Sequence, residues 1–314
     1  MGSPASNGAQ LAVLYEHPLW FQPLFAALDR RGLAYAPIHL ADHRFDPASR
    51  EVPAPVILSR VAQSSFLRQT EHPIFYASAL LDHWFRCGAV VLNGRKTLAI
   101  DSSKARQLSL MSSLGLATPE TRVVHRAEDL LAAAEEIGFP LLVKANIGGS
   151  GAGITRYTSL EELRASIADG TVPQSVDQVL LVQEYVPVRG GSILRIETLR
   201  GNFLYAIEVQ SSGEDFDLCP ADACVARPGR SAIRMNAVTP APELIRAAEQ
   251  IAHAAYMFVG GIEVIIDDRD GTPRFYDINA MSNFVADPLN VLGWDPHDRL
   301  IDVLETMVKG RVAA

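Results

Sequence analysis

Two acidic residues and an amide in the last third of the chain are spaced as ligands for a divalent metal ion. Residues 260–279 contain two runs of alternating apolar and polar side chains around an Asp-Gly pair, a pattern that predicts a β-hairpin. If the turn centres on Asp270, Glu263 falls opposite Asp277, and Asn279 follows two residues later on the same face of its strand. The opposite face is then filled by Ile262, Val264, Tyr276 and Ile278.

The opposed carboxylates indicate a bound cation. Two carboxylates directly across a strand pair repel each other and destabilise the hairpin unless positive charge lies between them. Oxygen ligands without His or Cys suit Mg²⁺ or Mn²⁺. Glu263, Asp277 and Asn279 are therefore candidate metal ligands, and the alternative is an ordinary hairpin with a solvated acidic face.

A glycine-rich loop at residues 144–153 holds a second group of candidate residues. The loop lies between two apolar runs, at residues 141–144 and 154–157, so it predicts a flexible β-hairpin flap rather than a strand-to-helix phosphate loop. Glycine lets backbone N–H groups approach phosphate oxygens, and Lys144 adds a positive charge. A structural turn without a ligand is the alternative. The loop residues are Gly148, Gly149, Ser150, Gly151 and Gly153.

Strands and helices alternate in the first hundred residues, which predicts a small parallel sheet. The strands are expected at residues 11–15, 56–59 and 89–92, and the helices at residues 18–31 and 73–87. Ligands of such sheets gather beyond the carboxyl ends of the strands. His17 and Arg60 lie at two of these ends and could bind a substrate carboxylate, with a surface salt bridge as the alternative.

The rest of the chain predicts a mixture of helices and strands. Ser159 and Glu162 form a capping box that opens a helix. Further helices are expected at residues 104–114, 126–137, 242–256 and 296–308, and further strands at 179–185, 192–199 and 203–210.

Composition argues against several classes of function. The 314 residues carry a formal net charge of −8, which leaves no general basic surface for nucleic acid or anionic lipid. The apolar runs are too short to span a membrane, and residues 1–6 lack the basic and apolar regions of a signal peptide. An odd count of 3 cysteines fits a reducing, cytoplasmic location. Cys219 and Cys224 have poor zinc spacing, so buried thiols are favoured over a metal site.

Taken together, these ordered motifs resemble the ATP-grasp superfamily, and within it the RimK-type branch of glutamate and peptide ligases. Residues 101–121 resemble the family's entry helix, which implies that Lys104 is the first phosphate-binding lysine. Residues 139–144 with the glycine flap resemble the second lysine, Lys144, and the lid over the triphosphate. Arg195 matches the arginine that faces the phosphates, and the acidic hairpin matches the metal set. The hinge that holds adenine through backbone groups and a Glu side chain corresponds to Gln183, Glu184, Tyr185 and Val186.

Several positions depart from the RimK-type pattern. Ile193 stands where these enzymes carry an acid near the ribose, and Asp277 replaces the usual Glu. Residues 216–224 and 280–284 replace the family's substrate segments. The resemblance thus implies a retained nucleotide half and a diverged substrate half, without glutamate specificity. Candidate contacts of the acceptor pocket are Asp222 and Asn283.

The resemblance implies an α/β (α+β) ATP-grasp fold with an N-terminal parallel α/β domain at residues 1–100, a linker helix and small lid domain at 101–190, and a C-terminal antiparallel-sheet domain at 191–314. It implies an ATP- and Mg²⁺-dependent carboxylate-amine ligase that works through an acyl phosphate, with Arg195 and Lys144 as catalytic residues. The expected partners are a small-molecule carboxylate and an amine, amino acids among them, and a homo-oligomer is left open. Two alternatives are a small-molecule kinase on the same fold and a nonenzymatic ATP-binding module.

Overall fold

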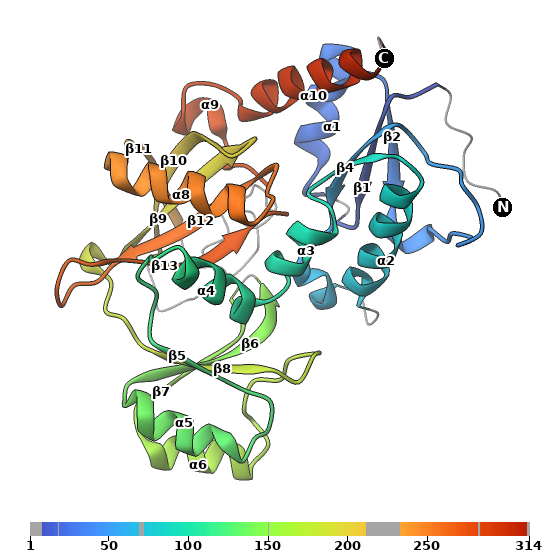
Figure 1. Cartoon of the computed structure of the whole chain (residues 1–314). Coiled ribbons are helices and arrows are strands. Elements are labelled where there is room, and N and C mark those ends of the chain that lie inside the picture. The colour runs from blue at the N-terminus through green and yellow to red at the C-terminus, as the bar shows by residue number, and fades with distance from the viewer. Residues whose placement is uncertain are drawn as a thin grey trace.

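The computed structural model describes residues 8–17, 19–68, 72–149, 151–211, 233–281 and 283–312 of the chain. In this part of the chain the strands form three sheets, one parallel and two antiparallel (Figure 1). Figure 1 shows the green strands of the second sheet as a small unit at one end of the molecule, with the blue parallel sheet and the yellow and orange third sheet beyond it.

The first sheet is parallel, with strand order β2-β1-β3-β4. Its strands and helices are β1 (Leu11–Tyr15), β2 (Tyr35–His39), β3 (Val56–Arg60), β4 (Val90–Leu92), α1 (Gln22–Arg31) and α2 (Pro73–Arg86). The first four residues of β1 and all of β3 are buried, as expected for central strands of a parallel sheet. Helix α1 begins four residues later than predicted and ends before Gly32, whose φ of 66° is the left-handed conformation of a helix C-cap.

The second sheet, with order β5-β8-β6-β7, has a hydrophobic core of its own. Its elements are β5 (Thr121–Val124), β6 (Leu141–Gly149), β7 (Ala152–Tyr157), β8 (Leu180–Glu184), α5 (Asp129–Ile137) and α6 (Leu160–Ala168). Leu130, Leu163 and Tyr157 are buried in this core, which is separate from the core of the other two sheets. Ser159 caps α6 as predicted, because its Oγ accepts the N–H of Glu162 at 3.2 Å. We call this unit the lid.

The third sheet is antiparallel, with order β11-β10-β9-β12-β13. Its elements are β9 (Ser192–Leu199), β10 (Asn202–Ser211), β11 (Ile233–Val238), β12 (Val259–Ile266), β13 (Pro273–Asn279) and α8 (Pro242–Ala254). Arg200 and Gly201, with φ of 54° and 77°, form the tight turn between β9 and β10. A Cβ on Gly201 would lie 2.3 Å from the ring of His253, so α8 packs directly against this turn.

The described part of the chain has four further α-helices: two lead from the first sheet to the second, and two follow the last strand. They are α3 (Arg95–Asp101), α4 (Lys104–Ser113), α9 (Pro288–Val291) and α10 (Pro296–Val312). Helix α10 returns to the first sheet and lies beside α1 (Figure 1), where Arg30 pairs with Asp298 at 2.8 Å and Arg31 pairs with Asp302 at 2.7 Å. We propose domains at residues 1–100, 101–190 and 191–314, with α10 as an extension of the last domain that covers the first.

Candidate active site

The hairpin of β12 and β13 pairs its acidic residues as the sequence predicts. Glu263 is the register partner of Asp277, and Gly261 is the partner of Asn279. On the other side of β12, strand β9 places Arg195 opposite Glu263. Since directly paired residues of antiparallel strands project to the same face, Arg195, Glu263 and Asp277 form one row across the sheet.

Tyr276 lies on the acidic face, so the prediction that it packs with Ile262 on the opposite face is wrong. The register shifts after Glu263, so that Val264 pairs with Phe275 and Tyr276 becomes the extra residue of a β-bulge. The bulge turns the Tyr276 phenol toward Glu263, and its O–H donates to Oε2 at 2.7 Å. Strict alternation of side chains cannot reveal this contact, because the bulge interrupts the alternation.

Two buried cations compensate the opposed carboxylates. Arg195 donates from Nη1 to Glu263 Oε1 at 2.9 Å and from Nε to Glu197 Oε1 at 2.7 Å. Lys104 donates from Nζ to Asp277 Oδ1 at 2.7 Å. The side chains of Arg195 and Lys104 are only 3% and 10% exposed, so solvent screens these pairs weakly. The protein itself therefore supplies positive charge beside both acids of the hairpin.

Burial and neighbouring charges shift the pKa values of this cluster. Burial raises the pKa of the Glu263 carboxyl, Arg195 opposes this rise, and Asp277 adds to it. Burial, followed by the positive charge of Lys104, lowers the pKa of the Lys144 ammonium to about 8. Burial also acts to lower the pKa of Lys104, but the carboxylates of Asp277, Glu263 and Asp101 together outweigh burial and raise the pKa overall. Lys104 is thus held in its charged form, whereas Lys144 titrates near physiological pH.

The loop between β6 and β7 brings its backbone close to the N-terminal part of the chain. Lys144 of β6 is buried, with Nζ 5.8 Å from the centre of the Tyr276 ring. A Cβ on Gly149 would lie 2.6 Å from the Cβ of Ser64 in the short 3-10 helix η2 (Gln63–Leu67), so this close approach requires glycine. The same hairpin contains Gly148, Gly151 and Gly153, whereas Ser150 lies outside the described residues.

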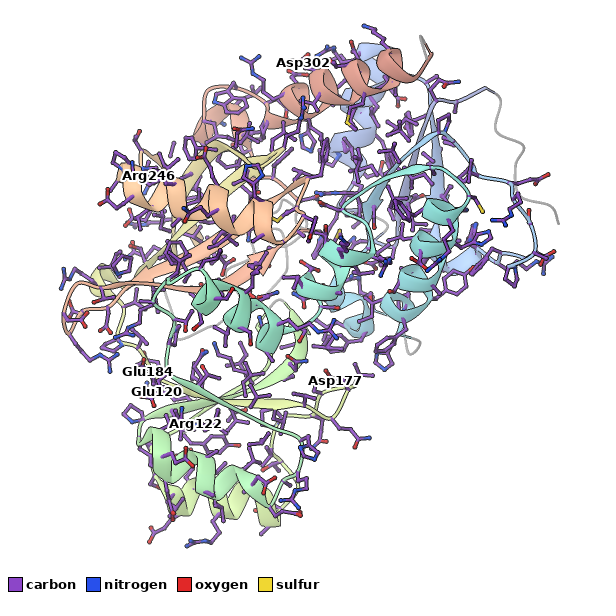
Figure 2. All side chains as sticks on the ribbon, in the orientation of Figure 1. Glu120, Arg122, Asp177, Glu184, Arg246 and Asp302 are labelled. Carbon is purple, nitrogen blue, oxygen red and sulfur yellow. The ribbon has the colours of Figure 1, made fainter. Side chains whose placement is uncertain are left out.

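The side chains of residues 183–186, the expected adenine hinge, contact other residues of the chain. The carboxylate of Glu184 accepts the N–H of Glu120 at 2.8 Å and Nη2 of Arg269 at 2.7 Å. Figure 2 shows Glu184 and Glu120 next to each other at the edge of the lid. The other hinge contacts are Gln183 Nε2 to Thr121 Oγ1 at 2.9 Å, the Tyr185 ring 4.1 Å from the Arg156 guanidinium, and the buried Val186.

Asp267 binds Arg269, the arginine that donates to Glu184 of this hinge. It accepts hydrogen bonds from Arg269 at 2.6 Å and from Arg274 at 2.8 Å, and its side chain is fully covered. The Arg269 hydrogen bond is the main reason that the pKa of the Asp267 carboxyl lies well below its usual range. We expect Asp267→Asn to lower the free energy of unfolding at pH 7 by about 1–2 kcal/mol, because charged hydrogen bonds are lost to Arg274 and to Arg269, which is itself 47% exposed.

This loss should depend on pH with a definite sign. A lowered folded-state pKa stabilises the protein only while the unfolded carboxyl is ionised, so the difference between Asp267→Asn and wild type should shrink as pH falls below about 4. Urea midpoints at pH 7 and pH 3 measure it. Asp268→Asn, at a side chain that is 62% exposed, is the control. Equal losses at both pH values would contradict the role of the Asp267 charge.

The residues proposed for the substrate carboxylate are buried. His17 follows β1 and Arg60 ends β3; they are 8% and 2% exposed, so the alternative of a surface salt bridge is wrong for both. His17 Nδ1 accepts the N–H groups of Leu19 and Trp20, each at 3.1 Å. Asn283 is also buried and donates to the carbonyl of Trp20. Asp222, Cys219 and Cys224 lie outside the described residues.

The family model of the RimK-like ATP-grasp domain matches residues 101–287, more than half of the chain. The chain belongs to this RimK-like ATP-grasp family. The match includes Lys104, Lys144, Arg195 and the acidic hairpin. The family predicted from the ordered motifs is therefore confirmed.

Curated relatives of this RimK-like protein are named as ligases. D-alanine–D-alanine ligase B of Pseudomonas syringae pv. tomato is 32% identical over 120 residues, which are 38% of this chain and 35% of that protein. A probable alpha-L-glutamate ligase of Pseudomonas fluorescens is 27% identical over 145 residues, which are 45% of this chain and 46% of that protein. The similarity thus spans between about a third and a half of the length of these relatives.

A solved structure has the same fold over almost the whole chain. The ATP-grasp ligase PsnB, in complex with a minimal precursor, aligns with a TM-score of 0.68 over 95% of this chain and 99% of that chain, at 18% identity. This similarity concerns the fold. The predicted ATP-grasp fold, with its parallel and antiparallel sheets, is confirmed.

Two buried acids near the ATP-grasp motif residues were missed from the sequence. Glu197 is 1% exposed and pairs with Arg195; Asp101 is 2% exposed and accepts the N–H of Ala280 at 2.7 Å. Burial raises the pKa of Asp101 to about 7. Burial lowers the pKa of the Arg60 guanidinium to about 10, and the negative charges of both carboxylates oppose this shift. Alternation with Arg195 on β9 was a usable signal for Glu197, whereas Asp101 lies far from the hairpin in sequence.

The hairpin fits the magnesium ion that the ATP-grasp family implies. Among the described residues, no three His, Cys, Asp or Glu side chains gather into a cage made of protein alone. Glu263 and Asp277 offer carboxylate oxygens on one face, and the amide of Asn279 lies beside them, with Nδ2 3.1 Å from Glu263 Oε1. Mg²⁺ is usually held by one or two carboxylates together with substrate phosphates. The residues present suit that kind of site.

Proposed function

We propose that the protein is an ATP-dependent, ADP-forming carboxylate-amine ligase that uses Mg²⁺ or Mn²⁺. The observation that carries the proposal is the convergence of Lys104 and Arg195 on the paired acids Glu263 and Asp277, with Lys144 nearby in the lid. Positioning and charge neutralisation supply most of the catalysis in phosphoryl transfer, and this cluster offers both. The curated relatives described above are ligases by name.

The nucleotide is proposed to lie between the lid and the third sheet. Lys104 and Lys144 would bind the phosphates, assisted by backbone N–H groups of residues 148–153. Arg195 would face the γ-phosphate: Nε is held by Glu197 and Nη1 by Glu263, while Nη2 has no hydrogen-bond partner among the described residues. Magnesium held by the hairpin would neutralise charge that develops on the phosphate oxygens. Residues 183–186 are proposed to contact adenine.

The proposed reaction has two steps. A substrate carboxylate oxygen attacks the γ-phosphorus of ATP, an O–P bond forms, and ADP leaves with the electron pair of the broken bond. An amine then attacks the acyl carbon, the amide C–N bond forms, and inorganic phosphate leaves as the amine loses a proton. Both steps place negative charge on oxygens that the buried Lys104, Lys144 and Arg195 can stabilise.

The carboxylate substrate is proposed to lie where the parallel sheet meets the hairpin. Arg60 Nη1 lies 3.4 Å from the carbonyl of Ala280, the residue after Asn279, and His17 and Asn283 meet at Trp20. Arg60 supplies positive charge there, and Glu197 and Asp101 supply negative charge. An amino acid, with both a carboxylate and an ammonium group, is the proposed substrate class. Free glutamate is not expected to be preferred, because residues 216–224 and 280–284 depart from the RimK-type pattern; Asp222 is a proposed contact.

A cytoplasmic location is proposed from the odd cysteine count and the chemistry of the site. None of the helices in the described part of the chain is long and apolar enough to cross a membrane.

Binding and turnover test the proposed function. ATP with Mg²⁺ at 100 times its Kd is expected to raise the free energy of unfolding by about 2.7 kcal/mol, as mass action requires for a native-state ligand. ADP release, screened across amino acids and amines, should require both substrates and yield amide, ADP and phosphate in equal amounts by mass spectrometry. Adenosine with Mg²⁺ is the control for binding that does not involve the phosphates.

Other outcomes identify the alternatives. A phosphorylated substrate with ADP and no amide would identify a small-molecule kinase. Stabilisation by ATP without turnover on any acid and amine would identify a nonenzymatic binding module. Absence of any stabilisation by ATP would contradict the proposed nucleotide site.

A further inference from the structure

Asn146 of β6 joins three segments through one buried amide. It lies two residues after Lys144 and is 4% exposed. Its Oδ1 accepts the Oγ–H of Ser103 at 3.1 Å and the N–H of Ala105 at 2.9 Å, both at the start of α4. Its Nδ2 donates to Asp177 Oδ2 at 2.6 Å, in the loop before β8. Figure 2 shows Asp177 at the edge of the lid.

The backbone around Asn146 departs from the regular pairing of β6 with β7. The pairing of β6 with β7 is interrupted between Lys144 and Gly149, so residues 145–148 have no register partner in β7. The N–H of Asn146 donates to the carbonyl of Val179 at 3.1 Å instead. Asp177 is fixed in turn, because its Oδ1 accepts from Ser175 Oγ at 2.6 Å and from the N–H of Val179 at 3.2 Å.

We call the three side-chain hydrogen bonds of Asn146 the bridge. The bridge connects the two elements that carry the proposed phosphate lysines. Lys104 is the first residue of α4, and Lys144 lies on β6. The first N–H groups of a helix have no partner within the helix, and here a lid residue accepts that of Ala105. Within the described residues, both hydrogen bonds between the first turn of α4, with its cap Ser103, and β6 end on Asn146. The two lysines repel each other across this interface, and the hydrogen bonds of Asn146 act against that repulsion.

We propose that Asn146 is a positioning residue that holds the lid on α4 and so sets the spacing of Lys104 and Lys144 for a triphosphate. The inference rests on the proposed ATP-binding function. In this arrangement the neutral amide of Asn146 keeps the like charges of Lys104 and Lys144 close together and makes no hydrogen bond to either ammonium group. A residue that only stabilised the lid would affect all ligands of the site equally, whereas a residue that spaces the lysines affects the phosphate part of binding.

Three variants of the full chain test the bridge. Asn146→Leu removes all three side-chain hydrogen bonds at similar volume. Asn146→Asp keeps the acceptor for Ser103 and Ala105 but sets a second carboxylate against Asp177. The double variant Asn146→Asp/Asp177→Asn reverses donor and acceptor at unchanged net charge, because the new amide at position 177 donates to the new carboxylate and still accepts from its own loop. Tyr157→Phe is the matched control, since it removes a hydrogen bond to Ser166 inside the lid, away from α4.

Calorimetry measures the dissociation constants of ATP with Mg²⁺ and of adenosine. The ratio of the two constants reports how much the phosphates contribute to binding. We expect Asn146→Leu and Asn146→Asp to lose about ten- to a hundredfold in the preference for ATP over adenosine, as the loss of hydrogen bonds to a charged group predicts. The double variant should recover most of that loss, and Tyr157→Phe should keep the wild-type ratio.

The outcomes are distinguishable. Unchanged ratios in both single variants, or a loss in Tyr157→Phe as large as theirs, would overturn the positioning role while leaving ATP binding intact. Failure of the double variant to recover would attribute the loss in Asn146→Asp to the carboxylate at position 146 rather than to the broken hydrogen bond with position 177, and would also overturn the positioning role. If the wild type bound ATP no better than adenosine, the proposed function itself would fail.

Discussion

Asp277→Asn is expected to slow ATP-dependent product formation by a factor of about 1,000, or about 4 kcal/mol of transition-state stabilisation. The change removes one of the two carboxylates that face each other on the hairpin, and with it a proposed metal ligand. It also removes the carboxylate that holds Lys104 at 2.7 Å. Both effects weaken the neutralisation of charge on the transferred phosphoryl group. ADP release with saturating Mg²⁺ and substrates measures the rate.

The same variant should have a modest effect on the folded protein without metal. Opposed carboxylates alone would make Asp277→Asn neutral or slightly stabilising, because it relieves repulsion with Glu263. The structure adds Lys104, whose side chain is 10% exposed and pairs with Asp277. Losing that charged partner costs about 1–3 kcal/mol, which the relieved repulsion partly offsets. We therefore expect a small net loss of stability, measured as the urea midpoint without metal.

Asp268→Asn, at the exposed turn of the same hairpin, is the control and should change neither rate nor midpoint. A strongly destabilised Asp277→Asn protein that still turned over at the wild-type rate would contradict the metal-site assignment. It would identify the hairpin as a structural element.

Three strands, β2, β5 and β11, were not predicted from the sequence, and all three are edge strands. β2 (Tyr35–His39) contains Pro37 and is at best half-buried, and β11 (Ile233–Val238) alternates half-buried residues with exposed Arg234 and Asn236. Each of the three has only one neighbour in its sheet, so none needs the continuous apolar run that marks a central strand. By contrast, β1 and β9 were predicted with their observed bounds, because their burial dictates their composition.

The hairpin shows how far sequence patterns reach into the candidate site. The pairing of Glu263 with Asp277 follows from strand alternation and the turn, both of which are local. The contact of Lys104 with Asp277 joins residues 173 positions apart, so only tertiary packing determines it. The bulge at Tyr276 is local, but it depends on the ladder with β12 and leaves no mark in the alternation.

The substrate side was the least accessible to sequence reasoning. The predicted strands correctly placed His17 and Arg60 at the carboxyl ends of β1 and β3. They gave no indication that both side chains are buried. Burial there depends on contacts with segments far along the chain, such as the carbonyl of Ala280 beside Arg60. The burial of chemistry-bearing side chains is thus not predicted where the sheets meet.

Lys144→Ala is expected to weaken the binding of ATP with Mg²⁺ by about 100-fold, because a buried charge on the phosphates is lost at a site that excludes water. The pH dependence of the wild type should carry the signature of the same residue. Burial and Lys104 lower the pKa of Lys144 to about 8, so below pH 8 the ammonium is already charged when ATP arrives. Above pH 8, ATP binding must be accompanied by proton uptake at Lys144.

The sign of this effect follows from linkage: the affinity should be constant below pH 8 and should fall above it, by about tenfold between pH 7 and pH 9. Lys104 stays charged across this range, because Asp277 raises its pKa. Lys144→Arg keeps a positive charge at every pH and should therefore bind ATP with little change up to pH 9. Calorimetric Kd values at pH 7, 8 and 9 for wild type, Lys144→Ala and Lys144→Arg decide the matter. An alkaline loss of affinity that persists undiminished in Lys144→Arg would show that another group titrates and that Lys144 does not bind the phosphates as its protonated form.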